Sequence, residues 1–207
     1  MSVLKKFPLF QGLAEDELKI IADTMTLKRY KSKAIIFLEE DKAGTFFFIL
    51  EGAIRIFKSN PVGKEVTLAL LFKGDFFGET GMITGGKRTA GAEALEPSLL
   101  MGLARKKFIE ILKSHGELSF KLLQEVSWRL IQTNEQLEAL VSQDLQGRVK
   151  ECLHRYQGFK LTHQEIANIV GASRESVSRA LCRLQESGEI EYDNKKFTVR
   201  CDPDHSK

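Results

Sequence analysis

Short runs of β-branched and aromatic residues, broken by turn-forming residues, occupy the chain from residue 27 to residue 104. Twelve of the sixteen glycines fall in the first 116 residues, where they mark the turns between these runs. Many short strands at regular spacing are typical of an antiparallel sandwich or barrel. The sequence therefore predicts a β-roll. Its expected strands are 27–31, 34–38, 45–50, 53–58, 65–71, 89–94 and 98–104.

A short amphipathic helix is expected ahead of the first strand, over residues 15–24. Its apolar residues recur at the helical interval of three to four positions. They are Leu18, Ile21 and Ala22, with Met25 directly after the helix. This apolar side is expected to pack on the end of the roll.

A long helix is expected between Gly116 and Gly147, because this stretch contains no proline and no further glycine. Its seam positions alternate spacings of three and four residues, the pattern of a coiled coil about four heptads long. A helix that joins two domains has few surfaces of its own chain to cover so narrow a stripe. The pattern therefore favours a parallel homodimer over packing within one subunit. The seam positions are Leu123, Val126, Leu130, the polar Thr133, Leu137 and Leu140.

Three short helices are expected beyond Gly147, the first over residues 148–156. Thr162 and Glu165 have the spacing of a capping box, which opens the second helix. A tight turn at Gly171 leads from the second helix to the third. The apolar positions of the second helix are Ile166, Ala167 and Val170.

The third helix is expected to begin after Ser173, a favourable capping residue, and to end near Gly188. A small β-hairpin follows, with strands over 190–192 and 197–200. Helix, turn, helix and hairpin in this order predict a winged helix-turn-helix. With the roll and the long helix, the fold class is α+β.

Composition narrows the class of protein. Hydrophobic residues make up 43% of the 207 residues and charged residues 29%, as in ordinary globular proteins, so intrinsic disorder is excluded. No stretch approaches roughly 18 consecutive uncharged apolar residues, which predicts a cytoplasmic protein with no membrane partner. The net charge of +3 is too small to identify nucleic-acid binding by itself.

The positions of cysteine and histidine argue against a metal or haem sensor. Cys152 is the first cysteine of the chain and His115 the first histidine. The roll therefore offers neither thiolates for an iron–sulfur cluster nor an imidazole for haem. The three cysteines are too widely spaced for a CxxC metal site or a disulfide framework. No metal site is expected.

The third helix of the C-terminal region has one apolar face and one open face. In a helix-turn-helix, the first turns of the second helix enter the major groove, where arginine suits guanine, glutamate suits cytosine and serine suits several bases. Gln164, Ser173 and Ser176 are expected to contact phosphates, which fixes orientation without reading sequence. The apolar face has Val177, Ala180, Leu181 and Leu184, and the open face has Arg174, Glu175, Ser178, Arg179, Cys182 and Arg183.

The stretch from Leu161 to Arg179 resembles the DNA-binding motif of the Crp/Fnr regulators. The resemblance extends over nearly the whole chain, because that family has a β-roll, a long helix and a winged helix in this order. It implies three parts. They are a double-stranded β-helix (jelly-roll) effector domain over 1–116, a dimerisation helix over 117–145, and a winged helix-turn-helix domain over 146–207.

The same resemblance implies a function. It makes the chain a ligand-responsive transcription regulator that acts as a homodimer, binds double-stranded DNA at an inverted repeat of TGA-like half-sites, and contacts RNA polymerase. Glu175 and Arg179 would read bases. Arg174 matches the cyclic-AMP receptor branch and Ser178 the Fnr branch, so the branch stays open.

A glycine-rich segment between Phe77 and Ala90 joins two predicted strands. Its glycines free backbone N–H groups to approach an anion. Arg88 can pair bidentately with a phosphate, while Glu79 can accept from a sugar hydroxyl. The segment resembles the phosphate-binding cassette of cyclic-nucleotide sensors at Gly78, Glu79, Arg88, Thr89 and Ala90.

Two residues of the long helix extend this resemblance. Thr133 and Asn134 align with the family positions that contact the base, Asn134 from the partner subunit. The resemblance thus implies a cyclic nucleotide, cAMP or cGMP, as effector and no other cofactor. The cassette departs from the family pattern at Thr80, Gly81 and Lys87.

Three alternatives compete with this interpretation. Arg88 and Glu79 could pair only to stabilise the fold, with another effector or none. Residues 81–87 fit G-x-x-x-x-G-K, the start of a P-loop, but Arg88 stands where the magnesium-binding hydroxyl is required and a strand is expected instead of a helix. The protein is therefore not expected to be an enzyme. A cyclic-nucleotide-binding regulatory adaptor without DNA binding is the alternative function.

Overall fold

The computed structural model describes residues 3–60, 62–63, 65–193 and 196–199. The chain divides into two compact units, Met1–Arg129 and Leu130–Lys207. The end of the second predicted hairpin strand, Arg200, lies outside the described residues, as does Cys201. No helix in the described ranges is long and apolar enough to cross a membrane.

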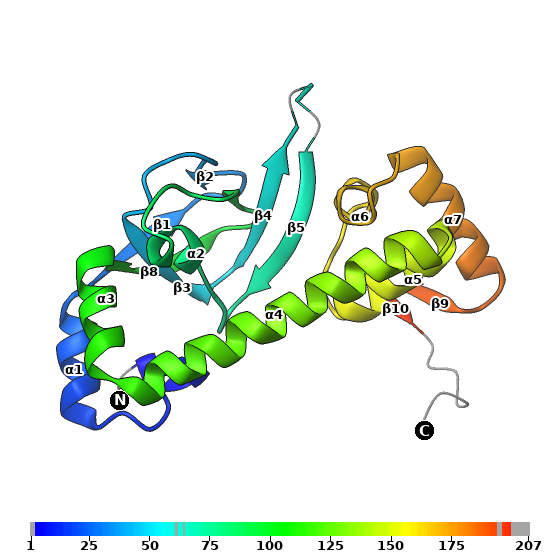
Figure 1. Cartoon of the computed structure of the whole chain (residues 1–207). Coiled ribbons are helices and arrows are strands. Elements are labelled where there is room, and N and C mark those ends of the chain that lie inside the picture. Colours follow the sequence, from blue (N-terminus) through cyan, green and yellow to red (C-terminus); the bar gives the residue numbers. More distant parts are fainter. Residues whose placement is uncertain (1–2, 61, 64, 194–195, 200–207) are drawn as a thin grey trace. The chain divides into compact units, whose positions relative to one another are not determined.

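The first unit contains the predicted β-roll, built in its described part from two four-stranded antiparallel sheets (Figure 1). Each of the seven predicted strands is present, which confirms the α+β prediction for this unit. One sheet has the order β1 (Met25–Tyr30), β8 (Ser98–Ala104), β3 (Thr45–Glu51), β6 (Phe76–Phe77). The other has the order β2 (Ile35–Phe37), β7 (Gly91–Ala94), β4 (Ala53–Ser59), β5 (Glu65–Phe72).

The strands differ from the prediction near the glycine-rich segment. β7 begins at Gly91 instead of residue 89. The chain just before it bonds to a loop and not to the sheet, because the Arg88 N–H donates to the Asp41 carbonyl at 2.8 Å and the Glu40 N–H donates to the Arg88 carbonyl at 3.0 Å. The two-residue strand β6 was not predicted.

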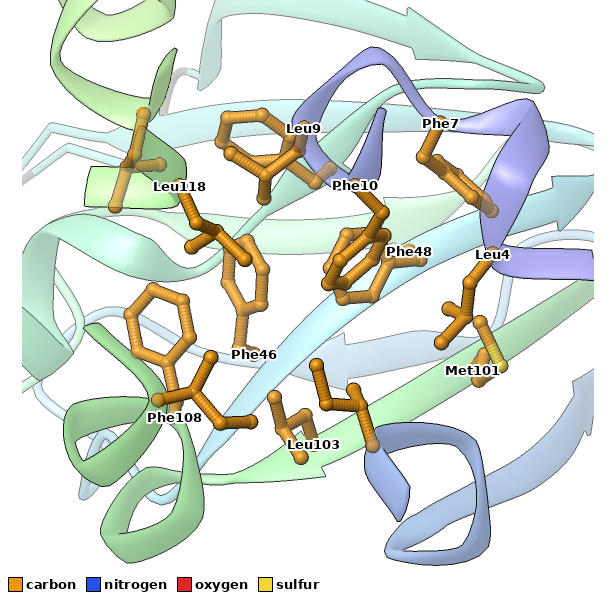
Figure 2. Packing of buried hydrophobic residues seen from close by; sticks show 14 of the residues in the cluster. Leu4, Phe7, Leu9, Phe10, Phe46, Phe48, Met101, Leu103, Phe108 and Leu118 are labelled. Carbon is orange, nitrogen blue, oxygen red and sulfur yellow. The ribbon is translucent and has the colours of Figure 1, made fainter. Parts of the chain in front are cut away.

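An aromatic core lies on one side of β3, whose residues alternate between two clusters. Phe46 and Phe48 are fully buried, and their ring centroids are 4.6 Å apart. Phe46 also stacks on Phe108 of α3 (Arg105–Ser114) at 4.3 Å. Figure 2 shows the N-terminal segment, the sheet and α3 contributing side chains to this core. The core therefore joins the helices of the first unit to the roll.

The helices around the roll were predicted only in part. The expected first helix is α1 (Glu15–Asp23), and Leu18 and Ile21 are buried in the aromatic core as predicted. Four elements were not predicted. They are α3, the short helix α2 (Glu79–Ile83) and the 3₁₀ turns η1 (Val3–Lys6) and η2 (Pro8–Phe10).

The predicted long helix is α4 (Gly116–Ser142). Leu118 and Leu122 in its first turns are buried in the core of the roll. α4 ends earlier than Gly147 because Asp144 caps the next helix, with its carboxylate accepting the Gly147 N–H at 2.9 Å. α5 (Leu145–Arg155) thus begins three residues before the predicted start at residue 148.

The second unit contains the predicted helix-turn-helix and hairpin. α6 (His163–Val170) opens with the capping box, in which the Glu165 N–H donates to the Thr162 hydroxyl at 3.2 Å and the Thr162 N–H donates to the Glu165 carboxylate at 2.6 Å. Gly171 has a φ of 69°, a left-handed conformation that favours glycine. The remaining elements are α7 (Arg174–Glu186), β9 (Ile190–Asp193) and β10 (Lys196–Val199).

The apolar stripes of α6 and α7 form the core of the second unit, as predicted. Ile166 of α6 and Val177 of α7 are fully buried, and Val149 and Leu153 of α5 pack in the same unit at 0% and 2% exposed. Ala180, Leu181 and Leu184 are also buried, which leaves the opposite face of α7 for a partner.

Candidate effector site and nucleic-acid interface

Arg88 lies inside the roll and ties the glycine-rich segment to β3. Its side chain is buried, with the residue 4% exposed. Nη1 donates to the Gly78 carbonyl at 2.9 Å and Nη2 donates to the Thr45 carbonyl at 2.6 Å. The guanidinium also lies 4.0 Å from the ring centroid of Phe37. Burial lowers the pKa of Arg88, and the nearby Glu79 and Asp41 oppose that shift, so the group stays a cation.

One nitrogen of this guanidinium is not used by the fold. Within the described residues, Nε of Arg88 is buried without a hydrogen-bond partner. An unsatisfied buried donor costs free energy, and such donors gather where a ligand or water completes the bonding. Arg88 is thus held by two of its five N–H donors, and its Nε is the nitrogen left without a partner.

Glu79, the predicted sugar-binding residue, pairs with a residue that the sequence analysis did not select. Its carboxylate lies 3.6 Å from Nη1 of Arg129, and Glu79 is 8% exposed. Arg129 also donates from Nη2 to the Phe76 carbonyl at 2.9 Å, and its guanidinium lies 4.4 Å from the centroid of the Phe76 ring. The structural alternative considered above paired Glu79 directly with Arg88. At this site, among the described residues, Glu79 instead forms its ion pair with Arg129.

The glycines of the cassette are required by close contacts. Gly78 has a φ of 87°, and a Cβ on it would lie 2.5 Å from Nη1 of Arg88. A Cβ on Gly81 would lie 2.3 Å from the carbonyl oxygen of Lys87. The departure from the family pattern at Gly81 therefore has a steric reason in this chain.

The other predicted ligand residues have different surroundings. Ala90 is buried, and Thr89 is exposed next to Arg88. Thr133 and Asn134 are exposed on the part of α4 that belongs to the second unit. The cassette residues come together in the first unit. The role of Thr133 and Asn134 in contacting a base stays a prediction.

A cavity of about 420 Å³ lies elsewhere in the first unit, between the N-terminal segment, the turn before β6 and α4. It contains none of the predicted ligand residues. Asp75 lines it, and burial raises the pKa of the Asp75 carboxyl. Its aromatic lining residues are Phe7, Phe76 and Trp128.

The open face of α7 has the predicted residues. Arg174, Glu175 and Arg179 are exposed, and Ser176 and Ser178 are half-buried. The exposure of these residues follows from the burial of the apolar stripe on the opposite side of α7, because residues three to four positions apart share one face of a helix.

Hydroxyl groups order the start of α7. Ser173 caps the helix by accepting the Ser176 N–H at 3.2 Å, and its hydroxyl donates to the Ser176 hydroxyl at 3.0 Å. Ser176 in turn accepts from Nη2 of Arg179 at 3.1 Å. The guanidinium expected to read a guanine is therefore held by a side chain one turn earlier.

Two further contacts concern α6. Gln164 donates from Nε2 to Oδ1 of Asn168 at 2.9 Å, a bond within that helix. His163, which the sequence analysis did not select, has Nδ1 at 2.8 Å from the hydroxyl of Ser178 on α7. Nothing in the local sequence pattern signals this contact, because the two residues are 15 positions apart.

Comparison with known proteins agrees with this arrangement. A model of the cyclic nucleotide-binding domain matches residues 27–115, and a model described as bacterial regulatory proteins, crp family, matches residues 159–190. The cyclic AMP receptor protein of Thermus thermophilus is 31% identical over 203 residues, which cover 95% of this chain and 94% of that protein. The chain belongs to the Crp family of bacterial regulatory proteins.

A further relative and two solved structures are also similar to this chain. The global nitrogen regulator of Synechocystis is 31% identical over 206 residues, which cover 92% of this chain and 89% of that protein. The crystal structure of Thermus thermophilus catabolite activator protein superposes with a TM-score of 0.58 at 31% identity, covering 93% of both chains. FixK2 from Bradyrhizobium japonicum has a TM-score of 0.78 at 21% identity and supports the fold alone, covering 86% of this chain and 93% of that one.

Membership of the Crp family determines the class of activity. Its members are transcription regulators, so this chain is a ligand-responsive, DNA-binding transcription regulator and not an enzyme. The geometry agrees for the P-loop-like run, because Lys87 is followed by the buried Arg88 and then by strand β7. A P-loop leads into a helix that receives the phosphates.

Proposed function

We propose that this Crp-family regulator binds an inverted repeat of TGA-like half-sites as a homodimer. The observation that supports this most directly is the open face of α7, where Glu175 and Arg179 are exposed and Val177 beneath them is fully buried. Because burial of the apolar side fixes the rotation of α7 about its axis, the same polar side chains always face outward and can meet base edges in the major groove. Gln164, Ser173, Ser176 and Arg174 would contact the phosphates and edges around them.

The proposed dimer uses α4. Leu123, Leu130 and Leu137 of the predicted seam are 60%, 61% and 56% exposed in the single chain. Large apolar side chains at heptad spacing are stabilised by a second helix of the same kind. A two-fold dimer would present its two α7 helices to successive major grooves, about 34 Å apart. In this scheme residues 1–116 form the effector domain, 117–145 the dimerisation helix and 146–207 the DNA-binding domain.

The proposed effector is a cyclic nucleotide bound at the cassette, cAMP or cGMP. Several relatives are named for cyclic AMP, whereas one equally similar relative is named a nitrogen regulator. Arg88 would pair with the phosphate, Glu79 would accept from the sugar, and Thr133 and Asn134 would contact the base. Gly78, Thr89 and Ala90 would shape the phosphate site.

A ligand at this site meets an arginine already engaged by the fold, because each Nη atom of Arg88 uses one of its two N–H groups on a main-chain carbonyl. The Nε–H and the second N–H of each Nη remain for a phosphate, and a phosphate that instead displaced the bond to Gly78 or Thr45 would release the cassette from its present position. The cassette would then shift relative to β3. Such a shift is the kind of two-state change that a ligand can bias.

Two measurements test the proposal. Native mass spectrometry of the purified protein with a panel of cyclic nucleotides should detect a dimer that binds one of them. Selection from random DNA should enrich an inverted repeat, more strongly with that nucleotide present. A protein that binds the nucleotide but enriches no sequence would instead be the regulatory adaptor without DNA binding. Regulation of transcription by binding to such an inverted repeat is called the operator function. Contact with RNA polymerase in the cytoplasm would follow from it and is testable by co-purification.

A further inference from the structure

The two helices of the helix-turn-helix share a side-chain contact at the edge of the open face. His163 is the first residue of α6, and Ser178 lies in the middle of α7. Nδ1 of His163 and the hydroxyl oxygen of Ser178 are 2.8 Å apart, a normal hydrogen-bond distance. Both residues are half-buried, so the pair is close to solvent on one side.

We propose that His163 is a positioning residue that determines what the Ser178 hydroxyl reads on a base. This inference rests on the proposed operator function and deepens it. A serine hydroxyl has one donor and two acceptor sites and rotates to suit its partner. An unrestrained serine therefore discriminates poorly among bases. A hydroxyl already bonded to an imidazole nitrogen has only part of this capacity left.

The polarity of the bond decides which bases suit Ser178. If Nδ1 accepts, the hydroxyl hydrogen is used and the oxygen can only accept, which suits the amino group of adenine or cytosine. If Nδ1 donates, the hydroxyl hydrogen is left over and suits an acceptor on guanine or thymine. The first arrangement makes the hydroxyl an acceptor only and therefore selective, whereas in the second the hydroxyl gains a fixed direction but its oxygen keeps one lone pair and can still accept.

Neighbouring contacts do not provide the same restraint. The hydrogen-bonded chain at the start of α7 runs from Ser173 through Ser176 to Arg179 and, within the described part of the structure, does not include the Ser178 hydroxyl. Gln164, next to His163 on α6, bonds to Asn168 of the same helix. Gln164→Ala is therefore the comparison for base preference: it removes a polar side chain from α6, should weaken binding to all sequences alike, and should leave the discrimination at each base pair unchanged.

The test is selection from random DNA followed by affinity measurements on single-base variants of the enriched site. Wild type, Ser178→Ala, His163→Ala and the double variant are compared. Ser178→Ala should reduce discrimination at one base pair of each half-site by roughly three- to tenfold, the effect of one ordinary hydrogen bond. His163→Ala should relax discrimination at that same base pair. In the double variant the His163 change should add nothing.

His163→Asn separates positioning from folding. The Asn amide can occupy the place of Nδ1 and either donate or accept, so this variant should restore discrimination at the affected base pair. Thermal melting of each variant checks that the fold is kept. A merely structural role of His163 would lower affinity for all sequences equally and leave the preference unchanged.

The possible failures are distinguishable. If the wild type enriches a site and His163→Ala keeps full discrimination at every base pair, this inference is wrong and the operator function stands. Additive effects of the His163 and Ser178 changes would also overturn it. A wild type that enriches no sequence would refute the proposed operator function, and the inference with it.

Discussion

Nη1 of Arg129 on α4 lies 3.6 Å from the carboxylate of Glu79 in the glycine-rich segment. The two groups are mostly shielded, since their side chains are 25% and 11% exposed. An arginine from the long helix therefore holds the carboxylate that is proposed to accept the sugar hydroxyl. Any rearrangement of the cassette has to keep or break this ion pair, which connects ligand binding to α4.

Replacing Arg129 should weaken effector binding. Arg129→Met keeps most of the side-chain length but removes the charge that orients Glu79. We expect the affinity for a cyclic nucleotide to fall about tenfold, the effect of one charge-assisted hydrogen bond. Titration calorimetry measures this. Glu125→Gln is the control, because Glu125 contacts the opposite side of Arg129 at 3.5 Å and is more exposed. Equal losses in both variants would contradict the specific role of the Glu79 pair.

Replacing Arg88 should affect both stability and binding. Arg88→Leu removes the two donors that satisfy the Gly78 and Thr45 carbonyls, and we expect the free energy of unfolding to fall by about 2–4 kcal/mol. Nucleotide binding should be lost as well. Lys87→Leu is the control, since Lys87 is exposed and pairs with the exposed Glu40. Urea denaturation measures the difference in the free energy of unfolding. An Arg88→Leu protein as stable as the control would show that the two bonds from Arg88 to the Gly78 and Thr45 carbonyls do not stabilise the fold.

Placing a charge in the seam of α4 should separate the subunits. Leu137→Lys sets two ammonium groups against each other in the proposed dimer, whereas Glu138→Lys changes charge on an exposed position outside the seam. Sedimentation velocity at micromolar concentration should show a monomer for the first variant and a dimer for the second. Specific DNA binding should be lost with the dimer, because one half-site alone has little affinity. A monomeric wild type would remove the basis of this prediction.

Two residues of the DNA-binding domain should differ in how they alter binding. Arg179→Ala removes a bidentate base contact, so it should cost about 1–3 kcal/mol and relax the preference at the guanine. Gln164→Ala should weaken all sequences alike, as expected of a phosphate contact. Selection from random DNA compares both with the wild type. An unchanged consensus for Arg179→Ala would show that the wrong face of α7 has been assigned.

The buried thiol of Cys152 should make stability depend on alkaline pH. Burial raises the pKa of Cys152 from 9.0 to about 12. The folded state thus keeps the proton longer than the unfolded state, and this stabilisation is complete below pH 9 and decreases as the pH rises toward 12. Its slope reaches about 1.4 kcal/mol per pH unit. Urea denaturation of wild type and Cys152→Ala between pH 8 and 11 isolates the effect, and parallel pH curves would contradict it.

The elements predicted from sequence are those specified by local patterns. Runs of β-branched and aromatic residues between turn-forming residues identified the long strands. The capping box at Thr162 and the cap at Ser173 identified both helices of the helix-turn-helix. α3 had a comparable signal in the spacing of Phe108 and Ile111, and it could have been predicted. β6 and α2 could not, because two and five residues are too few for any period to be visible.

The candidate sites were predicted in their residues but not in their contacts. The motif identified Arg88 and Glu79, whereas the partners of these two residues come from Thr45 on a distant strand and from Arg129 on α4. Likewise, the open face of α7 followed from its period, and the contact of Ser178 with His163 depended on how two helices pack. Such long-range contacts leave no mark in the spacing of residues along the chain.

Arg88 has a structural role beside the one proposed for it at the phosphate, and this bears on how such proteins evolve. An arginine that satisfies two main-chain carbonyls is maintained by selection for a stable fold even after the chain stops responding to any nucleotide. A descendant could therefore lose its signal and keep the Arg-Thr-Ala sequence intact. Surveys of genomes that count cyclic-nucleotide signalling by this short sequence would then overestimate such signalling. Exposed positions of the cassette, such as Thr89, would report the loss better than the buried Arg88.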